Sequence, residues 1–286
     1  MKIAIASGKG GTGKTTLATN LTFLLSRNCP VLLVDLDVEE PNSGFFINGK
    51  KKQEEKVYKM IPRWDKDRCN FCGDCQKVCR FNGVIQLAEE VLVFNKLCHS
   101  CYACSELCPQ HALPMHPYEV GTITEYEINR LHFVEGRLNV GEEQAVPLIR
   151  RTVKYTEKQF PSGMLRIFDA PPGTSCPMIE ATNGADYTIL VTEPTPLGLH
   201  DLTLAVEVMR GLRKDFGVVV NRYGIGDDKV IQYCHEKRIP LLGKIPNMRK
   251  AAEAYARGEL LAESIPEIRS AIHTVIQNLK MRKMLS

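Results

Sequence analysis

Short apolar segments alternate with longer amphipathic segments along most of the chain. Five short segments are apolar on both faces and rich in aliphatic residues: 2–6, 31–35, 165–169, 187–192 and 218–221. Strands of this kind are typical of sheets that helices cover on both sides. Longer segments with helical periodicity follow at 14–27, 198–214, 227–237 and 248–257. The alternation predicts an α/β fold with a doubly wound, mostly parallel sheet.

The alternation breaks between residues 42 and 140. A basic run at 50–52 leads into a cysteine-rich region, and residues 121–140 then alternate in a way that predicts a hairpin turning at Glu135 and Gly136. We therefore predict a small inserted domain at 62–118. The main domain is expected to consist of residues 1–61 and 119–286.

The last amphipathic segment, at 266–284, carries apolar residues at helical spacing and ends in basic residues. Its apolar positions are Ile268, Ile272, Val275, Ile276 and Leu279. We expect a closing helix packed on the sheet. A helix lying on a membrane surface is the alternative.

Composition narrows the class of protein. The net charge is only +4, which does not indicate nucleic-acid binding. The sequence has no run of 18 apolar residues, so we expect no transmembrane helix. The N-terminus is too soon glycine-rich for a signal peptide. Eight of the 11 cysteines fall between Cys69 and Cys108, a clustering that favours metal binding in a reducing, cytoplasmic protein over a disulfide framework.

The segment from Gly8 to Thr15 fits the pattern G-x-x-x-x-G-K-[ST] and lies between a predicted strand and a predicted helix. Its glycines allow backbone N–H groups to face phosphate oxygens, and the helix N-terminus favours negative charge. Lys14 is expected to reach the β- and γ-phosphates, and Thr15 to bind Mg²⁺. The predicted nucleotide-binding residues of this loop are Gly8, Lys9, Gly10, Gly11, Thr12, Gly13, Lys14, Thr15 and Thr16.

Two cysteine runs share the spacing C-x2-C-x2-C-x3-C, which is that of bacterial ferredoxins with two [4Fe–4S] clusters. In such runs the fourth cysteine ligates the other cluster. The first predicted ligand set is Cys69, Cys72, Cys75 and Cys108, and the second is Cys98, Cys101, Cys104 and Cys79. Zinc is the alternative, because C-x2-C pairs also bind Zn²⁺. Arg80 stands where a proline usually follows the first run.

Lys9 makes the phosphate loop resemble the deviant Walker A motif, K-G-G-x-G-K-T, of the MinD/ParA/nitrogenase-iron-protein class. In that class this lysine contacts the nucleotide of a dimer partner, so the resemblance implies an ATP-sandwich dimer. A solvated surface lysine is the alternative. The resemblance covers about 1–45 and 141–286.

Further motifs extend this resemblance. Asp37 matches the first switch residue that handles the attacking water and metal, and Asp169 matches the Walker B carboxylate. Gly173 matches a glycine of the second switch that can turn its N–H to the γ-phosphate, and Asn221 matches a residue that contacts adenine. Lys9, Lys14, Asp37 and Asp169 are thereby implied as catalytic. Ordinary strand-end carboxylates remain the alternative for Asp37 and its neighbour Asp35.

The whole chain resembles MinD/ParA/Mrp-superfamily P-loop ATPases that contain an inserted, small α+β ferredoxin domain of the bacterial type. The resemblance implies ATP, Mg²⁺ and two [4Fe–4S] clusters, and a homodimer or a heterodimer with a similar chain. The partner would be a redox protein or an apo metalloprotein. Cluster assembly or delivery, ATP-gated electron transfer, and a positioning ATPase with redox-sensing clusters are the three candidate tasks.

Three cysteines lie outside the runs. Cys29 and Cys234 are expected to be packing residues. Cys176 follows Asp169 by seven residues, an offset that resembles the ligand of the bridging cluster in nitrogenase iron protein. No second cysteine of that kind is found, so packing is its expected role and a redox role at a dimer interface is the alternative.

Overall fold

The computed structural model describes residues 1–128 and 130–285. The chain forms two compact units. The main unit comprises Met1–Glu54, Ile123–Arg137 and Ala145–Ser286, and the cysteine-rich unit comprises Glu55–Thr122 and Leu138–Gln144. The cysteine-rich unit is thus larger than the predicted insert at 62–118, and it includes a separate linking segment, Leu138–Gln144, which follows later in the chain.

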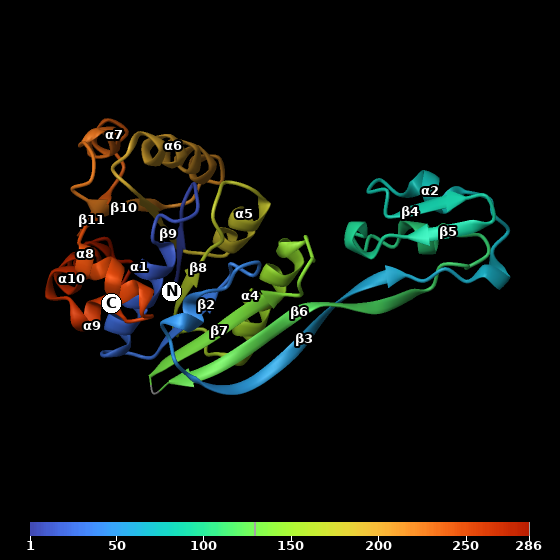
Figure 1. The fold of residues 1–286 in the computed structure, drawn as a ribbon, viewed down its shortest axis with the longest axis horizontal. Coiled ribbons are helices and arrows are strands. Elements are labelled where there is room, and N and C mark those ends of the chain that lie inside the picture. The colour runs from blue at the N-terminus through green and yellow to red at the C-terminus, as the bar shows by residue number, and fades with distance from the viewer. Residues whose placement is uncertain (129, 286) are drawn as a thin grey trace. The chain divides into compact units, whose positions relative to one another are not determined.

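A nine-stranded sheet organises the main unit (Figure 1). Its strands, in spatial order, are β11 (Leu241–Pro246), β10 (Phe216–Tyr223), β9 (Tyr187–Thr192), β1 (Lys2–Ala6), β8 (Leu165–Asp169), β2 (Val31–Asp35), β7 (Leu131–Leu138), β6 (Met115–Ile128) and β3 (Lys50–Pro62). Every neighbouring pair from β11 to β7 is parallel. The predicted α/β fold with a mostly parallel sheet is confirmed.

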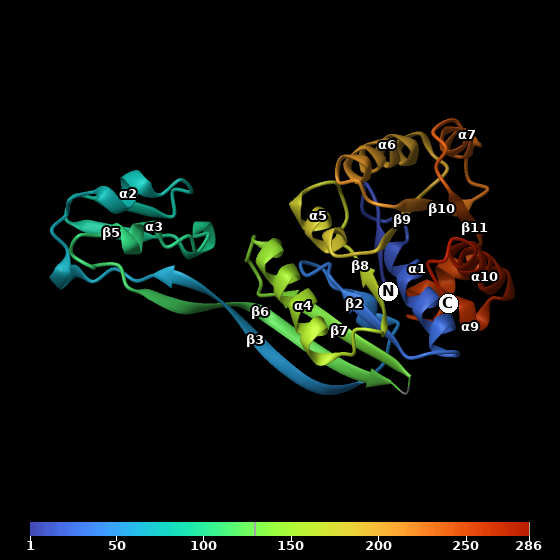
Figure 2. The same ribbon diagram turned by 180° about the vertical axis from the view of Figure 1, so that it is seen from behind.

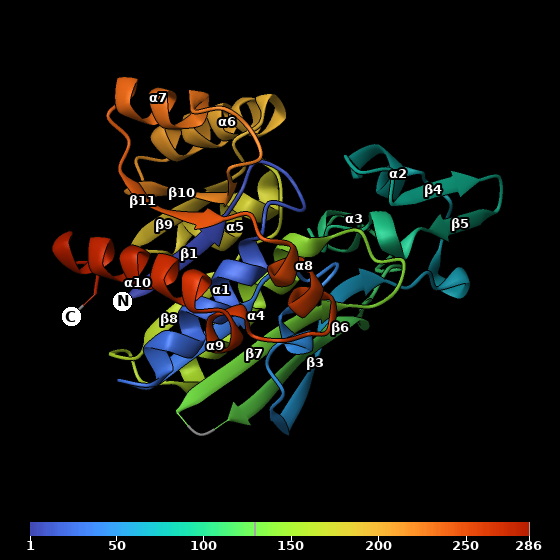
Figure 3. The ribbon, with the colours of Figure 1, turned by 60° about the vertical axis from the view of Figure 1, so that its left-hand side comes forward.

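Helices α1 (Lys14–Ser26), α8 (Arg249–Ala256), α9 (Leu261–Ser264) and α10 (Pro266–Met281) share one apolar core with the sheet. The remaining long helices are α4 (Ala145–Gln159), α5 (Cys176–Asn183), α6 (Pro196–Gly211) and α7 (Lys229–Glu236), visible in Figures 2 and 3. A 3₁₀ turn, η1 (Ser43–Phe45), follows β2. Successive residues of β1, such as Ile3 and Ala4, point to opposite faces and are both fully buried, as a strand with both faces covered requires.

The predicted closing helix is α10, which ends at Met281 rather than 284. All five of its predicted apolar positions are buried, and they belong to the core around α1. This packing supports the closing-helix interpretation over a membrane-surface helix. Among the helices of residues 1–128 and 130–285, none combines the length and the apolar character needed to cross a bilayer.

The hairpin predicted near residue 135 exists, but its turn was placed wrongly. β6 ends at Ile128 and β7 begins at Leu131, so Glu135 and Gly136 lie inside β7. Gly136 is there because a Cβ at this position would meet Thr152 Oγ1 at 2.6 Å and Val38 Cγ1 at 2.9 Å. A glycine that signals close packing in a strand resembles a turn glycine in sequence.

β3 was not predicted, because its first residues are charged or polar. It is hydrogen-bonded to β6 in the sheet, and ion pairs such as that of Lys52 Nζ with Glu125 Oε1, at 2.8 Å, add to the pairing. At the border of the main unit, Thr124 Oγ1 donates to Glu54 Oε2 at 3.2 Å. The chain therefore leaves the main unit and returns to it at directly neighbouring points of two paired strands.

The cysteine-rich unit contains two similar halves. Its elements are η2 (Lys66–Arg68), α2 (Asp74–Val78), β4 (Val84–Leu87), β5 (Glu90–Val93), η3 (Asn95–Leu97) and α3 (Ala103–Glu106). β4 and β5 form an antiparallel pair. One small buried apolar cluster of this unit consists of Val84, Val91, Cys104 and Leu113.

Candidate functional site

The phosphate loop connects β1 to α1, and its conformation depends on glycine. Gly13 has φ +95° at the N-cap of α1, and a Cβ there would lie 2.2 Å from Asn221 Nδ2. That amide donates to the carbonyl oxygen of Thr12 at 2.8 Å. Asn221, from β10, therefore fixes the loop from two strands away in the sheet, and no larger residue fits at position 13.

A cavity of about 430 Å³ opens at this loop, at the carboxyl end of the parallel strands. Such a position is typical of ligand sites in open α/β sheets. Of the predicted nucleotide-binding residues, those lining the cavity are Gly10, Gly11, Gly13, Lys14, Thr15, Thr16 and Asn221, together with Asp37. The predicted residues Gly8, Lys9, Thr12, Asp169 and Gly173 are not part of its lining.

The far end of the cavity was largely missed from sequence. It is lined by Asn247 and Met248, between β11 and α8, and by Tyr255 of α8. These positions carry no motif of their own, and only the strand end at Ile245 and Pro246 indicates them. Apolar and amide side chains opposite a phosphate loop suit a flat heterocyclic base.

Three carboxylates gather at the ends of β2 and β8. Asp35 is fully buried and accepts hydrogen bonds from the backbone N–H groups of Asp37 (3.1 Å), Asn42 (3.1 Å) and Ser43 (2.9 Å). Ser43 Oγ donates to Asp169 Oδ2 at 3.2 Å. Asp35 thus shapes the loop after β2, a positioning role that the sequence analysis did not assign to it.

Burial dominates the electrostatics of these groups. It raises the pKa of Asp37 and of Asp169 to about 6, and raises that of Asp35 well above its usual range, with the neighbouring Asp169 adding to the effect. Burial also lowers the pKa of Lys14, against the attraction of Asp169 and Asp37. Burial therefore disfavours the ionised form of these carboxylates, and a bound divalent cation would stabilise that form.

The donor set fits Mg²⁺ with a nucleotide. Asp169 Oδ1 is buried without a hydrogen-bond partner, and Thr15 presents a hydroxyl at the start of α1. Mg²⁺ prefers such oxygen ligands and keeps water and phosphate oxygens in its shell. Thr15 would hold the ion directly, and Asp169 would orient a water bound to it.

Lys9 is engaged within its own chain. Its Nζ lies 3.3 Å from Glu193 Oε2, while Arg222 Nη1 lies 2.7 Å from the other oxygen of Glu193. The carboxylate of Glu193 is almost fully buried, whereas Lys9 is about one-third exposed. Glu193 ends the apolar β9 and was not predicted, because a single acidic residue after a strand has no distinguishing pattern.

Gly173 lies in the loop between β8 and α5, with φ +94°. Its N–H donates to the carbonyl oxygen of Ser7, just before the phosphate loop, at 3.0 Å. An amide has a single hydrogen, so this N–H would have to release Ser7 before it could bind a phosphate oxygen. The loop after β8 is thus joined to the segment that precedes the phosphate loop.

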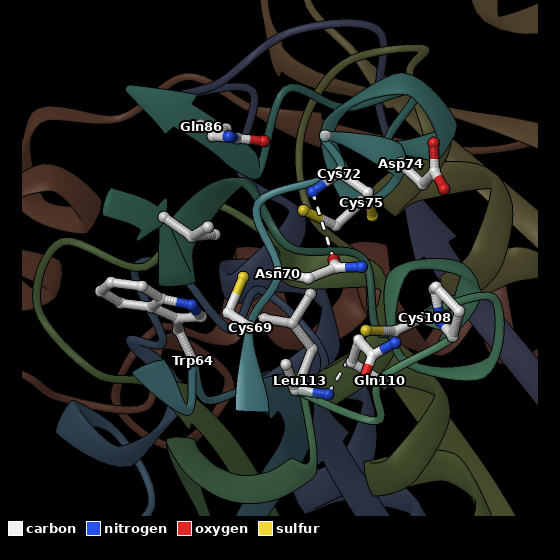
Figure 4. A pocket seen from close by; sticks show the side chains of 14 residues that line it. Trp64, Cys69, Asn70, Cys72, Asp74, Cys75, Gln86, Cys108, Gln110 and Leu113 are labelled. Carbon is white, nitrogen blue, oxygen red and sulfur yellow. Dashed lines mark hydrogen bonds between the residues drawn. The ribbon is translucent and has the colours of Figure 1, made fainter. Parts of the chain in front are cut away.

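In the cysteine-rich unit, four thiols line one pocket. This first cysteine set is Cys69, Cys72, Cys75 and Cys108. Figure 4 shows their sulfur atoms around the pocket, which Trp64, the only tryptophan of the chain, also lines. Three of these thiols come from the first run and one from the second, which is the crossed arrangement expected from the sequence.

The second cysteine set lines a separate pocket with Phe81 and Tyr102. It consists of Cys79, Cys98, Cys101 and Cys104. In both sets the cysteine donated by the other run accepts a backbone hydrogen bond: Gly83 N–H to Cys79 Sγ at 3.2 Å, and Ala112 N–H to Cys108 Sγ at 3.3 Å. Such hydrogen bonds to sulfur stabilise thiolates and tune the potential of a cluster.

The two runs also share an unusual backbone. Residues with positive φ recur at matching positions of the two runs: Phe71 and Ser100, Gly73 and Tyr102, and Asn82 and His111. Left-handed conformations cost non-glycine residues roughly 1–2 kcal/mol each. Strain of this kind persists where surrounding structure enforces it, commonly at ligand sites.

The thiol arrangement supplies the donors that an iron–sulfur cluster needs. Each set gathers four sulfur donors around one pocket. Four thiolates are the ligands of an iron–sulfur cubane, and they are also ligands that Zn²⁺ accepts. Burial and the neighbouring thiols raise the pKa of Cys104 to about 11, so ligation there would release a proton.

The remaining cysteines differ in exposure. Cys234 is buried and Cys29 is half-buried against the main core, as packing residues should be. Cys176 is exposed at the first residue of α5. Its expected packing role is therefore wrong for this isolated chain, because its side chain faces solvent.

The sheet, the phosphate loop and the buried strand-end carboxylates define a P-loop nucleotide-binding protein. The profile of the CobQ/CobB/MinD/ParA nucleotide binding domain matches residues 3–261. The chain belongs to this family.

Known proteins support this assignment. The chain is similar to an uncharacterized protein of Methanocaldococcus jannaschii, with 30% identity covering 91% of this chain and 90% of that protein. It is 26% identical to an iron-sulfur cluster carrier protein of Pyrococcus horikoshii, covering 88% and 76%. The cell division ATPase MinD of Pyrococcus furiosus shares the fold, with a TM-score of 0.60, 19% identity and 98% of each chain covered.

Proposed function

We propose that this protein binds and hydrolyses ATP and uses a nucleotide-driven change in a dimer to control two [4Fe–4S] clusters. One observation carries the proposal: eight thiols line two pockets, four in each, within a chain that also contains a phosphate-loop cavity. The region 62–118 would be a ferredoxin-like domain inserted in the ATPase domain. Clustered thiols of this kind suit the reducing cytoplasm.

At the nucleotide site, each group has a distinct role. Loop N–H groups from Gly10 to Thr16 would hold the phosphates, and Lys14 would neutralise charge on the β- and γ-phosphates. Asp37, which faces the cavity, would orient the attacking water. Preorganised charge of this kind is the main source of catalysis in phosphoryl transfer.

The dimer proposal rests on Lys9. Its ion pair with Glu193 is partly exposed, so it costs little to break. Released from Glu193, Lys9 could contact the nucleotide of a partner chain. The partner would be a second copy of this chain or a similar ATPase chain.

Two outputs remain within the proposal. Complete four-cysteine ligation of each cluster favours retention, and hence electron transfer to a redox partner. Delivery of clusters to an apo metalloprotein is favoured by the similarity to proteins named iron-sulfur cluster carriers. A positioning ATPase whose clusters sense redox state is the alternative, and the shared fold with MinD is what favours it.

The test is anaerobic purification followed by iron and sulfide analysis and EPR of the reduced protein, with and without Mg²⁺ and ATP. We expect about eight irons per chain, as two [4Fe–4S] clusters require, and spectra that change with nucleotide. Zinc in place of iron would refute the cluster assignment. Spectra indifferent to nucleotide would refute the coupling and favour the sensing alternative.

Incubation with an apo ferredoxin then separates the two outputs. Iron that moves to the acceptor only with ATP indicates delivery. Iron that stays bound, with a midpoint potential that shifts on addition of nucleotide, indicates electron transfer.

A further inference from the structure

The linking segment, Leu138–Gln144, belongs to the cysteine-rich unit although it connects β7 to α4. Glu142 anchors it: Tyr118 OH donates to Glu142 Oε1 at 2.8 Å, and Lys59 Nζ lies 3.6 Å from Glu142 Oε2. The side chains of Lys59 and Glu142 are only 6% and 4% exposed. A nearly buried ion pair is strongly destabilising to break, so the segment is held firmly.

The end of the linking segment contacts the second cysteine set. Gln144 Nε2 donates to the carbonyl oxygen of Lys96 at 2.9 Å and to that of Cys98 at 3.2 Å. Gly141, with φ +84°, allows the approach, because a Cβ there would lie 2.8 Å from Lys96 Nζ. A single amide thus fixes the backbone at the first ligand of the second set.

Gln144 is followed directly by α4, which is bound to α5. Arg150 Nε and Nη2 contact the two carboxylate oxygens of Glu180 at 2.9 and 2.8 Å. A bidentate pair fixes the relative orientation of its two side chains better than a single hydrogen bond does. It therefore links α4 to α5. α5 begins three residues after Gly173, whose N–H donates to the carbonyl oxygen of Ser7 just before the phosphate loop.

The first cysteine set is supported differently. Gln86, labelled in Figure 4, donates from Nε2 to the carbonyl oxygen of Phe71, between Cys69 and Cys72, at 3.0 Å. Gln86 lies on β4, inside the cysteine-rich unit. The two sets therefore have similar amide supports, but only the support of the second set is continuous with the helices of the main unit.

We propose that Gln144 is a positioning residue that couples the second cysteine set to the nucleotide state of the Gly173 loop, through α5, the Arg150–Glu180 pair and α4. The first set is not coupled in this way. The inference rests on the proposed function, because it requires clusters and a nucleotide-dependent loop. A displacement of α4 shifts the amide of Gln144 relative to Cys98, and so changes the hydrogen bonding and solvation around one cluster.

The experiment measures the midpoint potentials of both clusters by EPR-monitored titration of the full chain, with Mg²⁺ plus ADP or a non-hydrolysable ATP analogue. The signal altered by Cys101→Ser is assigned to the second set. In the wild type, we expect the potential of the second cluster to differ between nucleotides and that of the first to stay constant. Gln144→Leu should abolish the difference while iron content stays complete.

Two controls separate coupling from structural damage. Gln86→Leu removes the matching amide at the first set and should leave the nucleotide response of the second cluster intact. Arg150→Glu should abolish that response, and the double variant Arg150→Glu, Glu180→Arg should restore it, which general destabilisation would not do.

The outcomes distinguish the inference from the proposed function. A wild type without clusters or without a nucleotide response overturns both. A nucleotide response that persists in Gln144→Leu, or that resides in the first cluster, overturns only the coupling through Gln144.

Discussion

The main unit and the cysteine-rich unit differ in what stabilises their folds. In the main unit, strands and four helices bury a continuous apolar core, and the nucleotide cavity lies at its edge. In the cysteine-rich unit the buried apolar cluster beside the thiols has four members among the described residues, one of which, Cys104, is itself a predicted ligand. The apolar core of the main unit can therefore fold without a ligand and so create the nucleotide cavity. The cysteine-rich unit is expected to fold only when its thiols bind their clusters.

Removing the clusters should have the largest effect, because it should unfold the cysteine-rich unit and leave the main unit folded. Anaerobic iron chelation should remove nearly all hydrogen-exchange protection from β4, β5 and their neighbours, because the small apolar cluster around Val84 and Val91 cannot offset the chain entropy of this region. The strands around the phosphate loop should keep their protection. Exchange measured by mass spectrometry checks both, and protection of β4 that survives iron loss would contradict the idea.

Gly13→Ala should have the converse effect. A left-handed alanine costs roughly 1–2 kcal/mol, and its Cβ would also displace Asn221, so the affinity for Mg²⁺·ADP should fall by at least about tenfold. Iron content should not change. Calorimetric titration measures the affinity. Gly163→Ala is the matched control, since a Cβ at Gly163 meets nothing within 4 Å, and unchanged affinity in Gly13→Ala would refute the loop geometry.

Asp169→Asn should change how the stability of the main unit depends on pH. The folded pKa of Asp169 is about 6, above the 3.8 of an ordinary aspartate, so the wild type loses stability as the pH rises from about 4 through 6. Asparagine does not ionise, so the variant should gain on the wild type over that window, by up to about 3 kcal/mol at 1.4 kcal/mol per pKa unit.

Urea unfolding of the nucleotide-free protein at pH 4 and pH 8, followed by probes in the main unit, measures this gain. ATP hydrolysis should be lost in the variant. A stability difference that stays constant between the two pH values would show that Asp169 is not held in an unfavourable ionised state.

Lys9→Ala should have the smallest effect on stability. Its ion pair with Glu193 is partly exposed, and such pairs contribute about 0–1 kcal/mol. ATP-dependent dimerisation should nevertheless disappear, as light scattering after size exclusion can measure. Lys229→Ala, which removes an exposed pair with Asp227, is the control. Normal dimerisation of Lys9→Ala would mean that Lys9 acts only within its own chain.

The sequence predicts the central strands well because their residues leave little choice. β1, β2, β8 and β9 have the predicted bounds, since both faces of each strand are apolar and glycine or polar residues follow. β3 escapes prediction because cross-strand ion pairs, such as Lys52 with Glu125, replace apolar alternation. The strand conformation of β3 depends on its pairing with β6, which is distant in the sequence, and no local pattern shows that pairing.

The same limit applies to the sites. Contiguous motifs place the phosphate loop and both cysteine runs, because their ligands are close in the chain. Contacts across the sequence do not appear in any local pattern: Glu193 beside Lys9, Ser43 beside Asp169, and Gln144 beside Cys98. A single glutamate, serine or glutamine is chemically unremarkable until the fold brings its partner to it.

The position at which the chain leaves the sheet bears on how such a protein could arise. Glu54 and Thr124 are hydrogen-bonded neighbours on paired strands, so the 69 residues between them replace what could be a simple β-turn. The entropic cost of lengthening a closed loop grows only logarithmically with its length. Ancestral chains could therefore have acquired the cysteine-rich cassette in one genetic insertion without repacking the sheet, and its exact excision should leave a folded, iron-free descendant.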